Sequence, residues 1–245
     1  MLLNLTNLVS NAPADAVMLN PTDYVGVSFF AIMMAMIAAS VFFFLETQRA
    51  EGKWKTSLIV AGLVTMVAAW HYSYMRDMWA STYDAETGVG SSPVVFRYID
   101  WLITVPLQMI EFYLILAAIT KVSSGIFWRL MLGTLVMLVG GYIGESGLGN
   151  ETVFFAIGFA GWLFILYEIF AGEASKVCAA SATAGVKKAY GVLRIIVSLG
   201  WAIYPIGYWM QDAAQLNLIY NIADVVNKIA FGAIIWSIAT AKHED

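Results

Sequence analysis

Long apolar runs separated by short polar stretches make up most of the chain. Runs long enough to cross about 30 Å of hydrocarbon occur at positions 24–45, 54–79, 94–120, 126–144, 152–170, 185–210 and 214–241. Residues 1–22 are more mixed and carry no basic residue ahead of their apolar start, so we interpret them as an extracellular tail and not a secretory signal. The pattern predicts an all-α membrane protein, a seven-transmembrane-helix bundle formed by a single domain of residues 1–245.

Composition supports this interpretation. Hydrophobic residues make up 60% of the chain and charged residues 12%, a balance with too few polar groups to cover a soluble domain of 245 residues. One cysteine, Cys178, excludes an internal disulfide, and two histidines leave no ligand set for zinc. No basic patch of the kind that binds nucleic acid is present. We therefore expect a bilayer protein with no metal site and no nucleic-acid partner.

The distribution of basic residues predicts the orientation. They cluster at alternate connections, and the opposite side has almost none beyond Arg76. Because short cytoplasmic loops are enriched in Lys and Arg, the N-terminus is predicted outside and the C-terminus in the cytoplasm. The polar connection 80–93 is then extracellular, either as a short hairpin at its Gly-Val-Gly or as an irregular loop. The clustered residues are Arg49, Lys53, Lys55, Lys121, Arg129, Lys176, Lys187, Lys188, Arg194 and Lys242.

A lysine, Lys228, lies near the middle of the last apolar run. An ammonium at the bilayer centre costs roughly 2.5–3.5 kcal/mol on insertion scales, so Lys228 needs a partner. Asp224 lies one helical turn earlier on nearly the same face. The pair is either a structural ion pair, a lysine facing a water-filled cavity, or an amine that can condense with an aldehyde.

The third run carries a second polar group. At 100° per residue, Arg97, Asp100, Thr104, Gln108 and Glu111 fall within an arc of about 80°. Intramembrane carboxyls on one stripe, together with the lysine and Asp224 on another helix, suggest a path for protons. The alternative is a simple ion pair of Arg97 with Asp100 and an interfacial Glu111.

Aromatic residues can line a pocket for a long, flat, apolar ligand. Trp101, Trp162, Trp201, Tyr204 and Tyr208 lie in runs three, five and six. Pro205 lacks a backbone N–H and is expected to kink the sixth helix. Membrane proteins are also rich in interfacial Trp and Tyr, so only the combination with Lys228 favours a ligand pocket.

Three motifs on three predicted helices resemble one family. They are the segments 97–112 (RYIDWLITVPLQMIEF), 200–208 (GWAIYPIGY) and 218–228 (LIYNIADVVNK). On these motifs the chain resembles the microbial (type 1) rhodopsins, and among them the proteorhodopsins of the blue-absorbing type. The resemblance covers all seven runs.

The resemblance implies a light-driven outward proton pump and not an enzyme. All-trans retinal would be bound covalently to Lys228 as a protonated Schiff base. Asp100 would be its main counterion and proton acceptor, Asp224 a second counterion with Arg97 beside it, and Glu111 the cytoplasmic proton donor, kept protonated by apolar surroundings. Two other functions remain open: a photosensory rhodopsin that signals through a partner protein, and a seven-helix transporter without photochemistry.

Other positions follow from the same resemblance. His71 would pair with Asp100, and Gln108 would tune the pigment to blue light. Trp162 stands where antenna-binding relatives have glycine, so no carotenoid antenna is expected. Phe30 replaces a tryptophan that meets the histidine across a subunit boundary, and a phenyl ring cannot donate that hydrogen bond. The retinal pocket would comprise Trp101, Thr104, Gln108, Met137, Trp162, Trp201, Tyr204, Pro205 and Tyr208.

Family habit further implies a homo-oligomer, a pentamer or hexamer, in a bacterial inner membrane that the chain crosses several times. Glu145 lies just beyond the fourth run. We interpret it as a solvated loop residue, with an exit-side carboxyl as the alternative.

Overall fold

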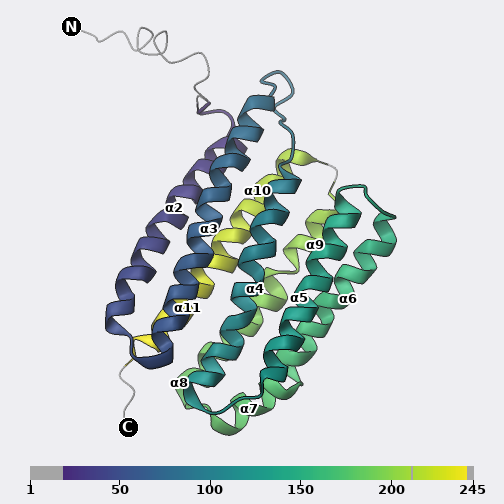
Figure 1. The fold of residues 1–245 in the computed structure, drawn as a ribbon. Coiled ribbons are helices and arrows are strands. Elements are labelled where there is room, and N and C mark those ends of the chain that lie inside the picture. The colour runs from purple at the N-terminus through teal and green to yellow at the C-terminus, as the bar shows by residue number, and fades with distance from the viewer. Residues whose placement is uncertain (1–18, 211, 242–245) are drawn as a thin grey trace, which may run out of the picture.

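The computed structural model describes residues 19–210 and 212–241, which form an up-and-down helical bundle (Figure 1). Seven of its helical segments are long and apolar enough to cross a membrane, which confirms the predicted fold class. In chain order the helices are α2 (Tyr24–Glu46), α3 (Gly52–Thr82), α4 (Val94–Ile119), α5 (Ser124–Glu145), α6 (Glu151–Phe170), α7 (Glu173–Ser181), α8 (Ala184–Ile195), α9 (Ile203–Tyr208), α10 (Ala213–Asp224) and α11 (Phe231–Ala239). A short 3₁₀ turn, Thr47–Arg49, follows α2.

Side-chain oxygens mark where several of these helices begin. The first N–H groups of a helix have no partner within it, so a short polar side chain just before the helix can accept from them. Asp23 accepts from Gly26 at the start of α2, and Asp212 accepts from Ala214 and Gln215 at the start of α10. Ser123, Asn150 and Thr183 cap α5, α6 and α8 in the same way.

Glycines bring α5 and α6 into close contact. A Cβ added at Gly140 would lie 2.8 Å from the backbone N of Gly158, and one at Gly161 would lie 2.6 Å from the backbone N of Met137. A Cβ at Gly133 would lie 2.8 Å from a side-chain carbon of α6. Small residues let helix backbones approach in lipid, where no hydrophobic force pushes helices together. The two helices lie side by side along the edge of the bundle in Figure 1.

A partly exposed ionic cluster joins α5 to the break between α6 and α7. Arg129 of α5 donates to Glu168 of α6 at 2.9 Å and to Glu173 of α7 at 2.6 Å. The Glu168 carboxylate, 2% exposed, also accepts from the backbone N–H of Ala174 at 3.0 Å. The helical segment that we placed at 152–170 therefore continues through α7 to Ser181, beyond a short break at residues 171–172.

The sixth and seventh spans are both interrupted. A π-helical segment, Ile196–Gly200, joins α8 to α9, and another, Val225–Ala230, joins α10 to α11. Pro205 accounts for the first interruption, because it cannot donate to the carbonyl of Trp201 and Tyr204 donates to that carbonyl instead, at 3.1 Å. The second has no proline and contains Lys228. π segments inside helices are frequent at functional sites.

The connection between α3 and α4 forms a tight turn. The Asp84 N–H donates to the Val89 carbonyl at 3.0 Å, and Gly88 adopts a positive φ of 71°, which favours glycine. The Asp84 carboxylate accepts from the Glu86 N–H at 2.9 Å and from the Thr87 hydroxyl at 3.1 Å. These hydrogen bonds lower the pKa of Asp84 from its ordinary value. The turn matches the short hairpin that the glycines allow.

Candidate functional site

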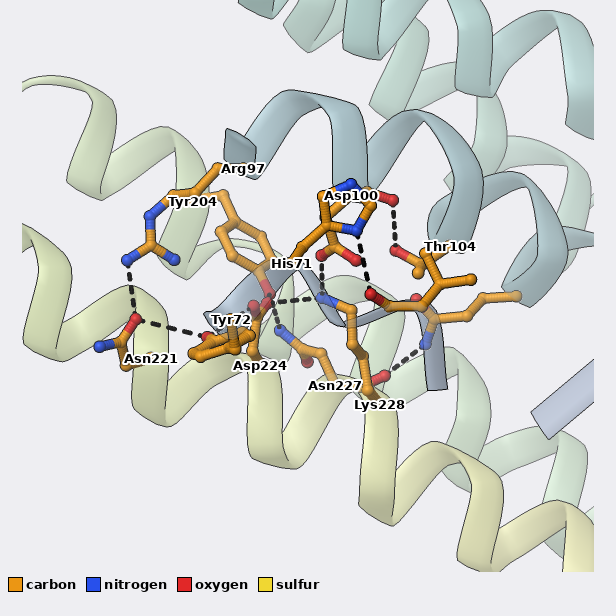
Figure 2. Close-up of polar contacts among 12 residues, drawn as sticks. His71, Tyr72, Arg97, Asp100, Thr104, Tyr204, Asn221, Asp224, Asn227 and Lys228 are labelled. Carbon is orange, nitrogen blue, oxygen red and sulfur yellow. Dashed lines mark hydrogen bonds and ion pairs between the residues drawn. The ribbon is translucent and has the colours of Figure 1, made fainter. Parts of the chain in front are cut away.

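The Lys228 amine lies between two carboxylates. Its Nζ is 3.0 Å from Asp100 Oδ2 and 3.0 Å from Asp224 Oδ1, and all three side chains are at most 2% exposed (Figure 2). Asp100 comes from α4, whereas Asp224 ends α10, one turn before the lysine. The Lys228 ammonium, for which the sequence offered only Asp224 as a nearby partner, therefore pairs with carboxylates from two helices.

The two carboxylates have different surroundings. Asp224 accepts from the Tyr204 hydroxyl at 2.6 Å and from the Tyr72 hydroxyl at 2.8 Å, in addition to its contact with Lys228. Asp100 has no hydrogen-bond partner among the described residues, and its one close polar contact is the ion pair with Lys228. A carboxylate offers about four acceptor sites. Asp100 thus keeps free acceptor capacity beside the amine, while Asp224 is held by two phenols.

Arg97 does not pair with Asp100. Its Nη2 donates to the amide oxygens of Asn217 at 2.8 Å and Asn221 at 2.7 Å, and Figure 2 shows its side chain directed away from Asp100. Its guanidinium also lies 5.3 Å from the centroid of the Tyr220 ring. The simple Arg97–Asp100 ion pair considered from the sequence is therefore wrong for the described residues.

Asn221 connects four helices. Its amide oxygen accepts from Arg97 of α4 at 2.7 Å and lies 3.3 Å from the Tyr72 hydroxyl of α3, and its Nδ2 donates to Ser28 of α2 at 2.9 Å. Sequence analysis missed this residue, although a signal was present. Positions 217, 221, 224 and 228 fall within about 60° on a helix. The same periodicity argument that we applied to α4 would have found this stripe.

His71 and Thr104 lie near the ion pairs but bond to their own helices. The His71 Nδ1 is 3.0 Å from the Val67 carbonyl, so this nitrogen carries the proton and Nε2 remains available. The Thr104 hydroxyl donates to the backbone carbonyl of Asp100 at 3.0 Å. No hydrogen bond joins His71 to Asp100 in the part of the chain that the structure describes, so their pairing stays a prediction.

Glu111 lies further along α4, towards the end of the bundle that holds α7. It is 1% exposed, and neither carboxyl oxygen has a hydrogen-bond partner among the described residues. The Ser57 hydroxyl of α3 lies beside it without forming a well-aligned hydrogen bond. An isolated carboxyl without hydrogen bonds is favoured in its neutral form, because the charged form would lose its hydration.

A cavity of about 770 Å³, counted with its open mouth, leads away from Lys228 between α4, α5, α6 and α9. Most of the surface of its walls is apolar. These residues fit retinal, since an aldehyde needs an amine and a polyene needs apolar walls. Of the pocket residues predicted from the sequence, only Thr104 is absent from the lining, which includes Trp101, Gln108, Met137, Trp162, Trp201, Tyr204, Pro205 and Tyr208.

The two π segments meet at Asn227, beside the cavity. Its Nδ2 lies 3.1 Å from the Gly200 carbonyl and 3.1 Å from the Tyr204 hydroxyl. Its backbone carbonyl accepts a hydrogen bond from the Gln108 amide. Asn227, next to Lys228 in sequence, therefore links the lysine's segment to α4 and to the broken sixth span. Sequence analysis also missed this residue.

Glu145 is not the solvated loop residue that we expected. It is the last residue of α5, is half-buried, and lines the cavity. Its Oε2 accepts from the Tyr98 hydroxyl at 2.8 Å. The apolar run appeared to end at 144 only because the next residue is charged.

The family model described as bacteriorhodopsin-like protein matches residues 23–242. Green-light absorbing proteorhodopsin from Gamma-proteobacterium EBAC31A08 is 51% identical over 234 residues, 93% of this chain and 91% of that protein. Blue-light absorbing proteorhodopsin from Gamma-proteobacterium Hot 75m4 is 50% identical over 235 residues, 93% of this chain and 90% of that protein.

Solved structures agree. The blue light-absorbing proteorhodopsin from Med12 matches with a TM-score of 0.73 and 49% identity, over 88% of this chain and 98% of that one. Exiguobacterium sibiricum rhodopsin matches with a TM-score of 0.81 and 31% identity, over 91% and 98% of the two chains. The chain therefore belongs to the bacteriorhodopsin-like protein family, with proteorhodopsins among its relatives.

Proposed function

We propose that this protein is a light-driven outward proton pump with all-trans retinal bound covalently to Lys228. The observation that carries the proposal is the position of the Lys228 amine, 3.0 Å from each of two carboxylates that differ in their hydrogen bonding. Membership of the bacteriorhodopsin-like family and about 50% identity to proteorhodopsins support a light-driven function.

When bound, retinal would supply the absorption of light and a change of geometry at the Lys228 nitrogen. Trp101, Trp201 and Tyr204 line the cavity and would restrict the chromophore to an extended shape. The apolar walls would also keep water from the site, so the nearby charges act at full strength.

Asp100 is the proton acceptor in this proposal. Its oxygens carry no hydrogen bond among the described residues, so one of them can take a proton from the nitrogen 3.0 Å away without first breaking a bond. Asp224 is the permanent counter-charge, because the Tyr72 and Tyr204 hydroxyls stabilise its ionised form. This difference gives the two carboxylates separate roles.

Glu111 is the proton donor. It is buried on the same helix as Asp100, further from Arg97, and no hydrogen bond from the described residues holds its charged form. A neutral carboxyl there can return a proton to the nitrogen once Asp100 has taken the first one. With the C-terminus in the cytoplasm, as the basic residues predict, this order of transfers moves protons outward.

Colour and assembly complete the proposal. Blue absorption is part of the proposal, and the Gln108 amide in the cavity lining supports it. Overall identity does not separate the green and blue relatives, at 51% and 50%. Trp162 donates to the Val197 carbonyl at 3.0 Å and lines the cavity, which disfavours an antenna at that position. The working form is a pentamer or hexamer in a bacterial inner membrane.

The test is expression in cells supplied with all-trans retinal. We expect a coloured membrane protein and, in an unbuffered suspension, acidification under light that a protonophore abolishes. A colourless product would contradict the retinal site. A coloured product without acidification would contradict the pump and favour a photosensory function.

A further inference from the structure

The cavity has a carboxyl group in its lining. Lys228 lines it from the π segment between α10 and α11, whereas Met137 and Gly141 line it from α5 and Phe155 lines it from α6. Glu145, one turn beyond Gly141 on α5, belongs to the same lining. A carboxyl in a mostly apolar cavity wall is costly unless it has a partner.

Glu145 is only partly satisfied. The Tyr98 hydroxyl donates to its Oε2 at 2.8 Å, and no other side chain or backbone group of the described residues donates to it. Its Oε1 is not sealed within the protein, and a carboxyl group accepts hydrogen bonds in either protonation state. One acceptor of a residue that lines the cavity is therefore available to a ligand.

Gly141 keeps this arrangement in place. A Cβ at this position would lie 2.8 Å from the Tyr98 hydroxyl oxygen, closer than such contacts normally occur. Glycine at this position thus allows Tyr98 to reach Glu145 across the cavity wall. The other phenols nearby already donate elsewhere: Tyr220 to the Tyr204 carbonyl at 3.0 Å, and Tyr208 to the Glu151 carbonyl at 3.3 Å.

We propose that Glu145, positioned by Tyr98, forms a polar subsite that favours a retinal carrying a hydroxyl group on its ring. This inference rests on the proposed function, because it takes Lys228 as the attachment point and so places the ring against α5 and α6, away from the helix that bears the lysine. A ring hydroxyl would donate to Glu145, whereas an unsubstituted ring leaves that carboxyl against carbon. A site built to bond a hydroxyl discriminates against the ligand that lacks it.

The test is competition for the apo-protein. Chromophore-free protein in detergent is mixed with equimolar all-trans-retinal and all-trans-3-hydroxyretinal. A second mixture pairs all-trans-retinal with all-trans-4-hydroxyretinal. The bound chromophores are then extracted and quantified by chromatography. We expect about ten-fold enrichment of at least one hydroxylated form, the size of one good hydrogen bond.

Variants locate the effect. Glu145→Leu should bring the ratio to about one, while Glu145→Gln, which keeps an acceptor oxygen, should retain most of the preference. Glu151→Leu, at an exposed position outside the cavity lining, is the matched control and should behave as the unmodified protein. If Glu145→Leu does not fold, Glu145→Gln and Gly141→Ala, which displaces Tyr98, give the comparison.

The outcomes separate the two proposals. Failure of every retinal to form a pigment would contradict the retinal site itself. Pigments that form equally well with the plain and both hydroxylated retinals would overturn the Glu145 subsite alone. A preference that survives Glu145→Leu would overturn it as well.

Discussion

The two sides of Lys228 differ in how their polar groups are bonded. On the side of the 83–93 turn, Arg97, Asn217, Asn221 and Asp224 form one connected network with Tyr72. On the side of α7, Glu111 is a single carboxyl with no hydrogen-bond partner among the described residues. Both sides are buried, so exposure does not explain the difference.

The difference shows how one bundle can keep charges on one side and a neutral acid on the other. A hydrogen-bonded network holds charged side chains at defined positions, as the two bonds from Arg97 Nη2 to Asn217 and Asn221 do here. An isolated carboxyl carries its proton until a nearby base needs it. In the proposed pump, the direction of proton transfer would follow from this difference in hydrogen bonding between the two sides.

Removing the amine between the two sides should have the largest effect. We expect Lys228→Arg to give a colourless protein with no light-driven pH change, because a guanidinium keeps the charge between Asp100 and Asp224 but cannot condense with an aldehyde. Lys228→Ala should be colourless too, and less stable by about 3–5 kcal/mol, since two carboxylates lose their cation. Visible absorption and denaturant unfolding measure these effects. A normal visible band in either variant would refute the attachment site, and Lys176→Ala, at an exposed position, is the control.

A substitution of Glu111 removes the isolated carboxyl and leaves the hydrogen-bonded network unchanged. Glu111→Gln cannot give up a proton, so we expect recovery of the resting pigment after a flash to slow by about 100-fold, the usual contribution of one acid–base group. Time-resolved absorption measures the decay. Glu151→Gln makes the same change at an exposed position and should leave the rate as it is. Equal rates in both variants would remove Glu111 as donor.

Loosening the network tests the opposite side. Asn221→Ala removes a partner from Arg97, Ser28 and Tyr72, and we expect the free energy of unfolding to fall by about 1–3 kcal/mol while the pigment still forms. Gln215→Ala, at an exposed position of α10, should change stability by less than about 0.5 kcal/mol. Similar losses in the two variants would mean that the network contributes nothing specific.

Gln108 lies between Asp100 and Glu111 on α4, where the hydrogen-bonded network and the isolated carboxyl meet. A substitution there tests its role in the colour of the pigment. Gln108→Leu removes an amide dipole from the cavity wall, and we expect the visible band to move to longer wavelength, because that dipole stabilises the ground-state charge arrangement more than the excited one. Met137→Leu, another lining residue, should shift the band less. An unchanged band in Gln108→Leu would reject the tuning role.

The smallest effect is expected at the turn outside the bundle. The pKa of Asp84 is lower in the folded protein than its ordinary value of 3.8. The hydrogen bonds of its carboxylate therefore stabilise the turn at pH values above 3.8, and this stabilisation is lost as the pH falls through the lowered pKa. Hydrogen exchange of the Glu86 amide should therefore speed up below about pH 3.8 in addition to its intrinsic pH dependence. Asp84→Asn should abolish this change and leave the visible band untouched. A shift of the band would show that the turn affects the buried charges.

Features set by spacing within one helix could be predicted from the sequence. The Lys228–Asp224 contact and the stripe from Arg97 to Glu111 both follow from about 100° per residue. Pro205 indicated the interruption of the sixth span, whereas nothing in the sequence indicated the π segment around Lys228.

Features set between helices could not be predicted. Which acceptors Arg97 chooses depends on how α4 and α10 are aligned, and that alignment places Asn217 and Asn221 within its reach in place of a carboxylate. Tyr72 of α3 donates its hydroxyl to Asp224, but nothing in the sequence of α3 distinguishes this tyrosine from its neighbours. Glu145 was misplaced because a charge at the end of an apolar run looks like a loop.

The close glycine contact of α5 and α6 has a consequence for how the bundle assembles. These helices are joined by only residues 146–150, and their contact uses backbone atoms of both helices and no chromophore. Contacts between segments close in sequence form with little loss of chain entropy. We therefore expect this hairpin to pair soon after insertion and to present the far wall of the cavity as a preformed surface on which the remaining helices close.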